Sequence, residues 1–111
     1  MYYCNIWPES DIELIQSTVD EYVHSDNPFF TYYMTVSGHK GYSYSGNSIA
    51  SKNRGLVDGL NYSMGPKAYI ATQIELDRAL ELLINKLSEA GKLDDTLIVM
   101  VADHYPYGLS L

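Results

Sequence analysis

The stretch AYIATQIELDRALELLINKLSEAGKLDDTLIVMVADH, residues 68–104, decides the fold class of this chain. Its first part carries an apolar stripe at helical spacing, made of Ile70, Ile74, Leu76, Leu80, Leu83 and Leu87. Pro66 suits the first turn of that helix, and Gly91 suits its C-terminal stop. The run TLIVMVA, residues 96–102, is apolar almost throughout, which is typical of a strand covered on both faces. The stretch therefore predicts a helix followed by a buried strand.

The residues before this stretch predict another helix and another strand. Ser10 and Glu13 match a capping box. The apolar residues that follow at helical spacing are Ile12, Ile15, Val19, Tyr22 and Val23. The run FFTYYMTV, residues 29–36, is rich in aromatic and β-branched residues without strict alternation, which favours a second two-sided strand. Such a strand–helix–strand unit predicts an α/β fold, with part of a largely parallel sheet flanked by helices.

Length and charge exclude several classes of protein. A chain of 111 residues forms one small domain, residues 1–111. Its formal net charge of -7 disfavours nucleic acid and anionic lipid as partners, because both are polyanions. No apolar run approaches the ~20 residues that span a bilayer, so we expect no membrane segment and a soluble chain. The single cysteine, Cys4, allows no internal disulfide and is expected to be a small apolar side chain.

Both predicted strands end close to a histidine. His39 follows the first strand in a Gly- and Ser-rich loop, whereas Asp103 and His104 directly follow the second. Parallel α/β sheets bind ligands outside the carboxyl ends of their strands. An adjacent carboxylate and imidazole offer the oxygen and nitrogen donors that divalent metals accept. Asp103 and His104 are therefore candidate metal ligands, and the competing interpretation is a turn cap beside a surface histidine.

Other polar residues have weaker patterns. His39 is a candidate proton donor or anion-binding residue, and the alternative is an exposed loop histidine beside Lys40. Thr35 and Ser37 carry hydroxyl groups but lack an adjacent base, so we expect structural roles for both. Asp77 fits a solvated position on the long helix.

Three blocks of this sequence, in this order, resemble the sulfatase-like enzymes of the alkaline phosphatase superfamily. They are NIWPESDIELIQSTVDEYV, PFFTYYMTVSGHKGY, and the opening stretch extended to YPYG. The likeness is greatest to the branch of lipoteichoic acid synthases and related phosphoglycerol transferases. This resemblance implies an α/β fold, a hydroxyl nucleophile that attacks phosphorus, and a divalent metal. Mn or Mg is the expected ion, with Ca or Zn as alternatives.

The resemblance assigns Asp103 and His104 as metal ligands and His39 as a contact to the phosphate or glycerol portion of the substrate. No residue here matches the family's nucleophile or its first acidic ligand, so no catalytic residue is assigned and the isolated chain is expected to be inactive. The family's catalytic domain is several times longer, so we interpret the chain as a C-terminal-side fragment of one. The residues YPY between His104 and Gly108 depart from the family's pattern, which leaves the loop geometry open.

The functional prediction is a fragment of a metal-dependent phosphoglycerol transferase or sulfatase. The parent enzyme would be membrane-anchored and extracellular, and would act on phosphate or sulfate esters at the outer face of a bacterial membrane. A phosphoethanolamine-type transferase and a stand-alone, non-catalytic binding domain remain open as alternatives. Because only two clear helices are predicted to cover two strands, we also expect the chain to self-associate through exposed apolar surface.

Overall fold

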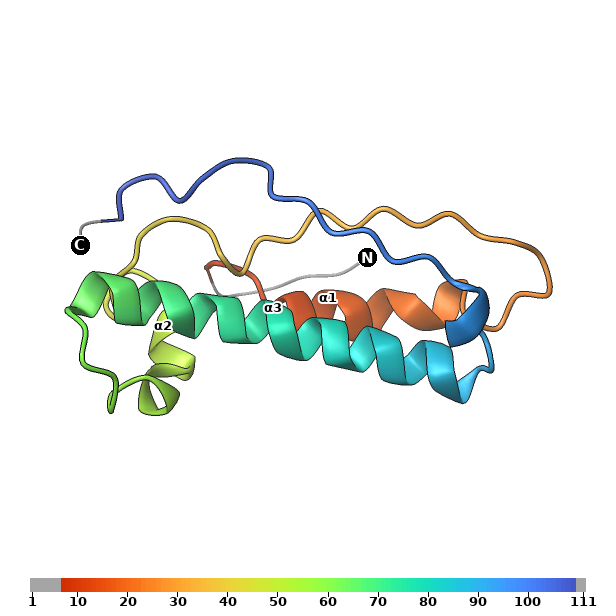
Figure 1. Ribbon diagram of the computed structural model, residues 1–111, viewed down its shortest axis with the longest axis horizontal. Coiled ribbons are helices and arrows are strands. Elements are labelled where there is room, and N and C mark those ends of the chain that lie inside the picture. Colours follow the sequence, from red (N-terminus) through yellow and green to blue (C-terminus); the bar gives the residue numbers. More distant parts are fainter. Residues whose placement is uncertain (1–6, 110–111) are drawn as a thin grey trace.

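The computed structural model describes residues 7–109 as helices overlaid by two long non-helical segments (Figure 1). The α-helices are α1 (Asp11–Thr18), α2 (Ser48–Lys52) and α3 (Met64–Glu89). Each is followed by a short 3-10 turn, in order η1 (Val19–Glu21), η2 (Arg54–Leu56) and η3 (Leu93–Asp95). None of the helices within residues 7–109 combines the length and apolar content needed to cross a bilayer. Cys4 lies outside the described residues.

Capping residues fix the ends of the two helices that the sequence predicts. Ser10 is the N-cap of α1, and its side chain accepts a hydrogen bond from the Glu13 backbone N–H at 3.3 Å. After α3, the N–H groups of Gly91 and Lys92 donate to carbonyl groups of the last turn, each at 2.9 Å, in a Schellman motif. Gly91 has a φ of 70°, which a residue without Cβ adopts at no steric cost. The predicted helix start and glycine stop are confirmed.

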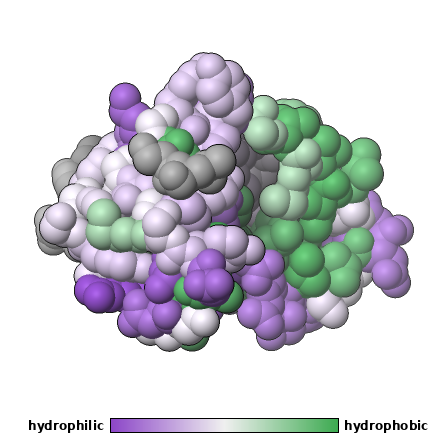
Figure 2. Space-filling model, turned by 60° about the vertical axis from the view of Figure 1, so that its left-hand side comes forward, coloured by the Kyte–Doolittle hydropathy of each residue, from purple (hydrophilic) through white to green (hydrophobic). Residues whose placement is uncertain are grey.

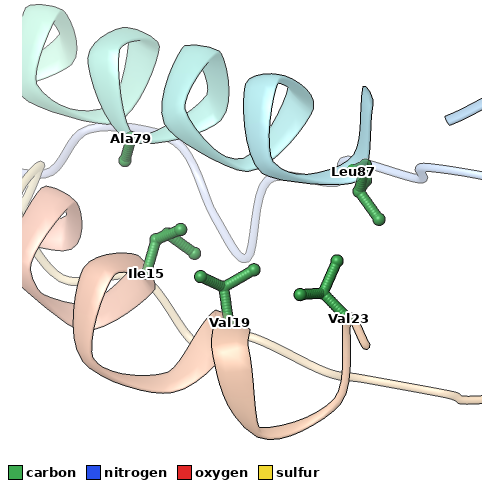
Figure 3. Packing of buried hydrophobic residues seen from close by; sticks show 5 residues of the cluster. All are labelled: Ile15, Val19, Val23, Ala79 and Leu87. Carbon is green, nitrogen blue, oxygen red and sulfur yellow. The ribbon is translucent and has the colours of Figure 1, made fainter. Parts of the chain in front are cut away.

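The main apolar core lies between α1 with η1 and the second half of α3. Figure 3 shows Ile15, Val19 and Val23 pointing toward Ala79 and Leu87 on α3. All five side chains are buried, with at most 4% of their surface exposed. The predicted apolar face of the first helix is therefore confirmed.

The buried face of α3 differs from the predicted stripe. It consists of Ala68, Ala71, Thr72, Glu75, Ala79 and Leu87. The larger predicted residues Ile70, Ile74, Leu76, Leu80 and Leu83 are only half-buried. Small side chains let neighbouring backbone approach closely, so the alanines lie innermost, and Leu83 in one cluster and Ile70 and Ile74 in the other pack around them. Only Leu87 belongs to both sets.

The two predicted strands, residues 29–36 and 96–102, lie on the same side of the helix pair and run in the same direction (Figure 1). Within residues 7–109 no strand pairing is present, so the parallel sheet stays a prediction. In each segment some side chains pack on the helices while others are exposed. In the first, Phe29 and Tyr33 pack against the helical core, whereas Phe30, Tyr32 and Met34 are 94%, 74% and 76% exposed.

The second segment is also divided between covered and exposed side chains. Ile98 packs against the same core, whereas Leu97, Val99 and Val101 are 86%, 71% and 84% exposed. The helices thus cover one face of each segment and leave the other face open. Figure 2 shows hydrophobic side chains gathered into one continuous area on one side of the molecule. The radius of gyration, 15.5 Å, exceeds the ~13 Å typical of a compact domain of this length.

A buried polar network around Glu75 joins all three α-helices. The fully buried carboxylate accepts hydrogen bonds from Ser10 Oγ at 2.6 Å, Lys52 Nζ at 2.7 Å and Asn53 Nδ2 at 3.2 Å. Ser10 caps α1, while Lys52 and Asn53 form the end of α2. Burial by itself raises the pKa of Glu75, but the bonds from Lys52, Ser10 and Asn53 outweigh burial and hold that pKa below its usual value.

Replacing Glu75 tests how much this network stabilises the fold. We expect Glu75→Gln to lower the free energy of unfolding at pH 7 by about 1–3 kcal/mol, because the hydrogen bonds lose their ionised acceptor. A carboxyl group whose pKa is lower in the folded than in the unfolded state stabilises the fold above the unfolded value, about 4.3. This contribution disappears as pH falls through the folded-state pKa. Urea unfolding between pH 7 and pH 3 should therefore show that the free energy of unfolding falls more steeply with decreasing pH in the unsubstituted chain than in Glu75→Gln.

The matched control is Asp77→Asn on the same helix, where the side chain is exposed. This variant should change the free energy of unfolding by less than about 0.5 kcal/mol. Equal effects of the two substitutions, or identical acid profiles of Glu75→Gln and the parent chain, would show that the network does not stabilise the fold.

The uncovered apolar face predicts self-association. We expect light scattering to give a mass above that of the monomer, increasing with concentration. Replacing Leu97 and Val99 together by lysine should restore the monomer, because buried unpaired ammonium groups are costly. Lysines at the exposed positions Ser51 and Ser88 add the same charge without touching this face, and should leave the mass distribution unchanged. If the unsubstituted chain is monomeric at all concentrations, the prediction is contradicted.

Candidate functional site

Asp103 and His104 follow the second extended segment and contact each other directly. Asp103 Oδ2 lies 3.3 Å from His104 Nε2, and Asp103 Oδ1 accepts the His104 backbone N–H at 2.9 Å. His104 Nδ1 lies 2.7 Å from the carbonyl oxygen of Tyr105. Because a carbonyl only accepts, this contact requires the proton on Nδ1 and leaves the Nε2 lone pair beside the carboxylate in the neutral ring. Metal-binding histidines are commonly oriented by such a bond to the backbone.

The residues YPY, which depart from the family's pattern, support the histidine ring. The rings of His104 and Tyr107 lie 4.7 Å apart between centroids, and those of Tyr105 and Tyr107 lie 4.5 Å apart. Tyr105 and Tyr107 therefore form an aromatic cluster that restricts the His104 side chain. The Asp103 side chain is 86% exposed and that of His104 is 49% exposed, so both are accessible to a ligand.

The chemistry of this pair fits two coordination positions of a divalent ion. One carboxylate oxygen and one imidazole nitrogen stand side by side, and both donor types suit Mn, Mg or Zn to different degrees. Within residues 7–109, no cluster of three or more His, Cys, Asp or Glu side chains could hold a metal. The described part of the chain therefore offers Asp103 and His104 as a pair of ligands.

His39 lies on a turn whose backbone is hydrogen-bonded on both sides. Its N–H donates to the Val36 carbonyl at 2.9 Å, and its own carbonyl accepts from Asn47 Nδ2 at 3.3 Å. The ring meets the edge of Trp7 at a centroid distance of 5.0 Å. Nδ1 lies 3.2 Å from the Lys40 carbonyl, so in the neutral ring this nitrogen carries the proton. Nε2 then remains to meet a ligand.

Asp11 attaches the residues before this turn to the start of α1. Its buried carboxylate accepts the N–H groups of Val36 and Ser37 at 2.9 and 3.2 Å. Burial raises the pKa of Asp11, the two backbone bonds oppose that shift, and the charge of Glu75 adds to it. Ser37 Oγ accepts the Asp11 N–H at 2.8 Å and donates to the Glu9 carbonyl at 3.0 Å. The buried Ser37 hydroxyl thus has a structural role, as its sequence context predicts.

The structure places the two histidine-bearing loops at the same end of the molecule (Figure 1). Burial raises the pKa of Tyr42, and the charges of Tyr69 and Asp103 raise it further. Tyr42 donates a hydrogen bond to the Gly38 carbonyl, in the turn that carries His39. Asp103 therefore lies within electrostatic reach of that turn.

Sequence reasoning missed three residues that support the site: Asp11, Asn47 and Glu75. Asn47 is the N-cap of α2, accepting the Ala50 N–H at 2.9 Å, and an Asn–Ser pair before an apolar dipeptide is a recognisable cap signal. Glu75 lies between buried alanines at helical spacing, which indicates a polar side chain on an inward face. Asp11 gave no signal beyond that of an acid in a first helical turn, because its partners are 25 and 26 residues away.

Comparison with known proteins gives two independent matches. Residues 1–109 match the family described as Sulfatase. The lipoteichoic acid synthase of Staphylococcus saprophyticus is 31% identical over 99 residues, a match that covers 86% of this chain. The chain spans only 14% of the length of that relative. No solved structure matches this chain.

The family match confirms the resemblance drawn from the three sequence blocks. It extends over the helix pair, the His39 turn and the Asp103–His104 pair together, and does not depend on one short motif. The chain belongs to the sulfatase family.

Proposed function

We propose that this chain supplies part of the active site of a metal-dependent phosphoglycerol transferase. The broader possibility within the same chemistry is a sulfatase, and both act on anionic phosphate or sulfate esters. Membership of the sulfatase family supports the ester chemistry. The likeness to a lipoteichoic acid synthase favours the transferase branch. By the same likeness, we place the parent protein in the bacterial cell envelope, membrane-anchored and with an extracellular catalytic domain.

The observation that carries this proposal is the contact between Asp103 and His104. The Nδ1 bond to the Tyr105 carbonyl fixes the tautomer of His104, and the ring of Tyr107 restricts its orientation. The carboxylate of Asp103 supplies negative charge at 3.3 Å from the imidazole nitrogen. A divalent ion held by these two residues, Mn or Mg in the first instance, would supply positive charge opposite the anionic oxygens of the ester.

His39 is the proposed contact to the substrate. When protonated, its Nε2 donates a charge-assisted hydrogen bond to a phosphate or sulfate oxygen, which is the stronger class of hydrogen bond. Its backbone is held by Val36 and Asn47, so binding does not require the turn to become ordered. A net charge of -7 otherwise repels an anionic substrate, so the metal and His39, with the exposed Lys40 beside it, would supply the local positive charge.

Two substitutions in the full-length protein separate these roles. Asp103→Asn keeps the side-chain shape but removes the charge, so we expect loss of bound metal and of turnover. His39→Gln should retain the metal and lower turnover by about 10²–10⁴-fold, the range for one acid–base or hydrogen-bonding group. The measurements are metal content by elemental analysis, and turnover of a phosphoglycerol ester and an aryl sulfate with excess Mn.

The control is Asp94→Asn, an exposed acid outside the site that should leave both measurements unchanged. Asparagine is a good turn residue, so a mere turn cap at position 103 would tolerate the substitution. Full metal occupancy with near-normal turnover in Asp103→Asn would therefore refute the ligand assignment.

A further inference from the structure

The turn that carries His39 is held by a buried side chain from a different element. We propose that Asp11, the first residue of α1, is a positioning residue for His39. This inference rests on the function proposed above for His39 as the contact to the substrate.

The first step is the attachment of the chain before the turn. Asp11 is 1% exposed, and each of its carboxylate oxygens accepts one backbone N–H, from Val36 at 2.9 Å and from Ser37 at 3.2 Å. Its own N–H donates to Ser37 Oγ at 2.8 Å. Three hydrogen bonds therefore join one residue of α1 to two consecutive residues of the loop, and two of them are charge-assisted.

The second step is the transmission to His39. The Val36 N–H is bound by Asp11, and the Val36 carbonyl accepts the His39 N–H at 2.9 Å, closing a turn over residues 36–39. Inside that turn, a Cβ added to Gly38 would lie 2.7 Å from Gln73 Nε2, so the turn is packed against α3. The position of the His39 backbone therefore follows from the position of Val36.

The third step is the support of Asp11 itself. The neighbouring Ser10 donates to Glu75 Oε1 at 2.6 Å, which ties the start of α1 to the middle of α3. On the other side of the turn, Asn47 holds the His39 carbonyl while capping α2. His39 is thus held in a frame made by all three α-helices, as preorganised binding residues require.

Both oxygens of the carboxylate are needed for this role. An asparagine at position 11 has one carbonyl oxygen and an NH₂ group, which cannot accept the second backbone N–H. A simple acid in the first turn of a helix acts through the helix dipole and would affect only stability. The two roles therefore differ in what Asp11→Asn does to the His39 ring.

The first test is amide hydrogen exchange in the 111-residue chain, followed by NMR. The N–H groups of Val36 and Ser37 should exchange at least about tenfold more slowly than those of Met34 and Thr35, which have no partner within residues 7–109. Similar rates at all four positions would overturn the proposal. In Asp11→Asn, exchange at Val36 and Ser37 should accelerate about ten- to hundredfold, because a hydrogen bond to a charged group is lost.

The second test follows the imidazole nitrogens of His39. The parent chain should show the Nδ1–H form that the Lys40 carbonyl contact requires, and Asp11→Asn should shift the ring toward the mixture of tautomers found in a free histidine. Inorganic phosphate added to the parent chain should perturb the His39 signal, and the apparent affinity should fall at least about tenfold in Asp11→Asn. Asp20→Asn, an exposed acid beside His24, should alter the His24 signal and leave His39 unchanged.

The outcomes separate the two proposals. Phosphate that leaves the His39 signal of the unsubstituted chain unchanged would refute substrate contact by His39. The exchange rates of Val36 and Ser37 and the tautomer of the His39 ring would still test whether Asp11 positions His39. Faster exchange at Val36 and Ser37 with an unaltered His39 ring would overturn the positioning role. If Asp11→Asn does not fold, Asp11→Glu decides, because it keeps the charge but moves both carboxylate oxygens by one methylene from the Val36 and Ser37 N–H groups. It should shift the His39 ring in the same direction, and an unchanged ring would overturn the proposal.

Discussion

The ionised carboxylate of Glu75 is the constraint on which the rest of the structure depends. It is fully buried on the inward face of α3, where an unpaired charge would be very costly. Its three partners come from the cap of α1 and from the end of α2, so satisfying the charge fixes both elements against α3. The directional bonds to Glu75 select one register, and the His39 turn takes its place from that register.

Local signals in the sequence predicted the helices well. Ser10 and Gly91 act at the helix ends as their chemistry requires, and Ile15, Val19 and Val23 form the predicted apolar face. The prediction of the buried face of α3 was wrong, because leucine and isoleucine are the most hydrophobic residues of the helix and were therefore expected to point inward. Packing instead placed small residues inward and left Ile74 and Leu76 half-buried. The outcome was decided by how closely α1 and α2 approach, and that distance is not encoded in the periodicity of one helix.

In the candidate site, too, local sequence signals predicted some residues, whereas contacts between distant parts of the chain determined the others. Asp103, His104 and His39 could be named from their positions after apolar runs, because strand ends are where such folds gather polar groups. The residues that hold them could not be named in the same way. Asp11 acts on Val36 and Ser37 across a long loop, and Tyr107 packs on His104 from three residues further along the chain. Such contacts arise from the folded arrangement, so only the structure reveals them.

The contacts of Phe29 and Tyr33 with the helical core constrain how this part of the protein can vary. Inserting one residue before Val36 would exchange the faces of the segment, turning Phe29 and Tyr33 outward and bringing Phe30 and Met34 against the helices. An insertion after His39 would leave those contacts and the turn over residues 36–39 in place, because Ser37 and Asn47 are anchored separately. Changes in loop length are therefore easier to accommodate between His39 and Asn47 than in the residues before His39.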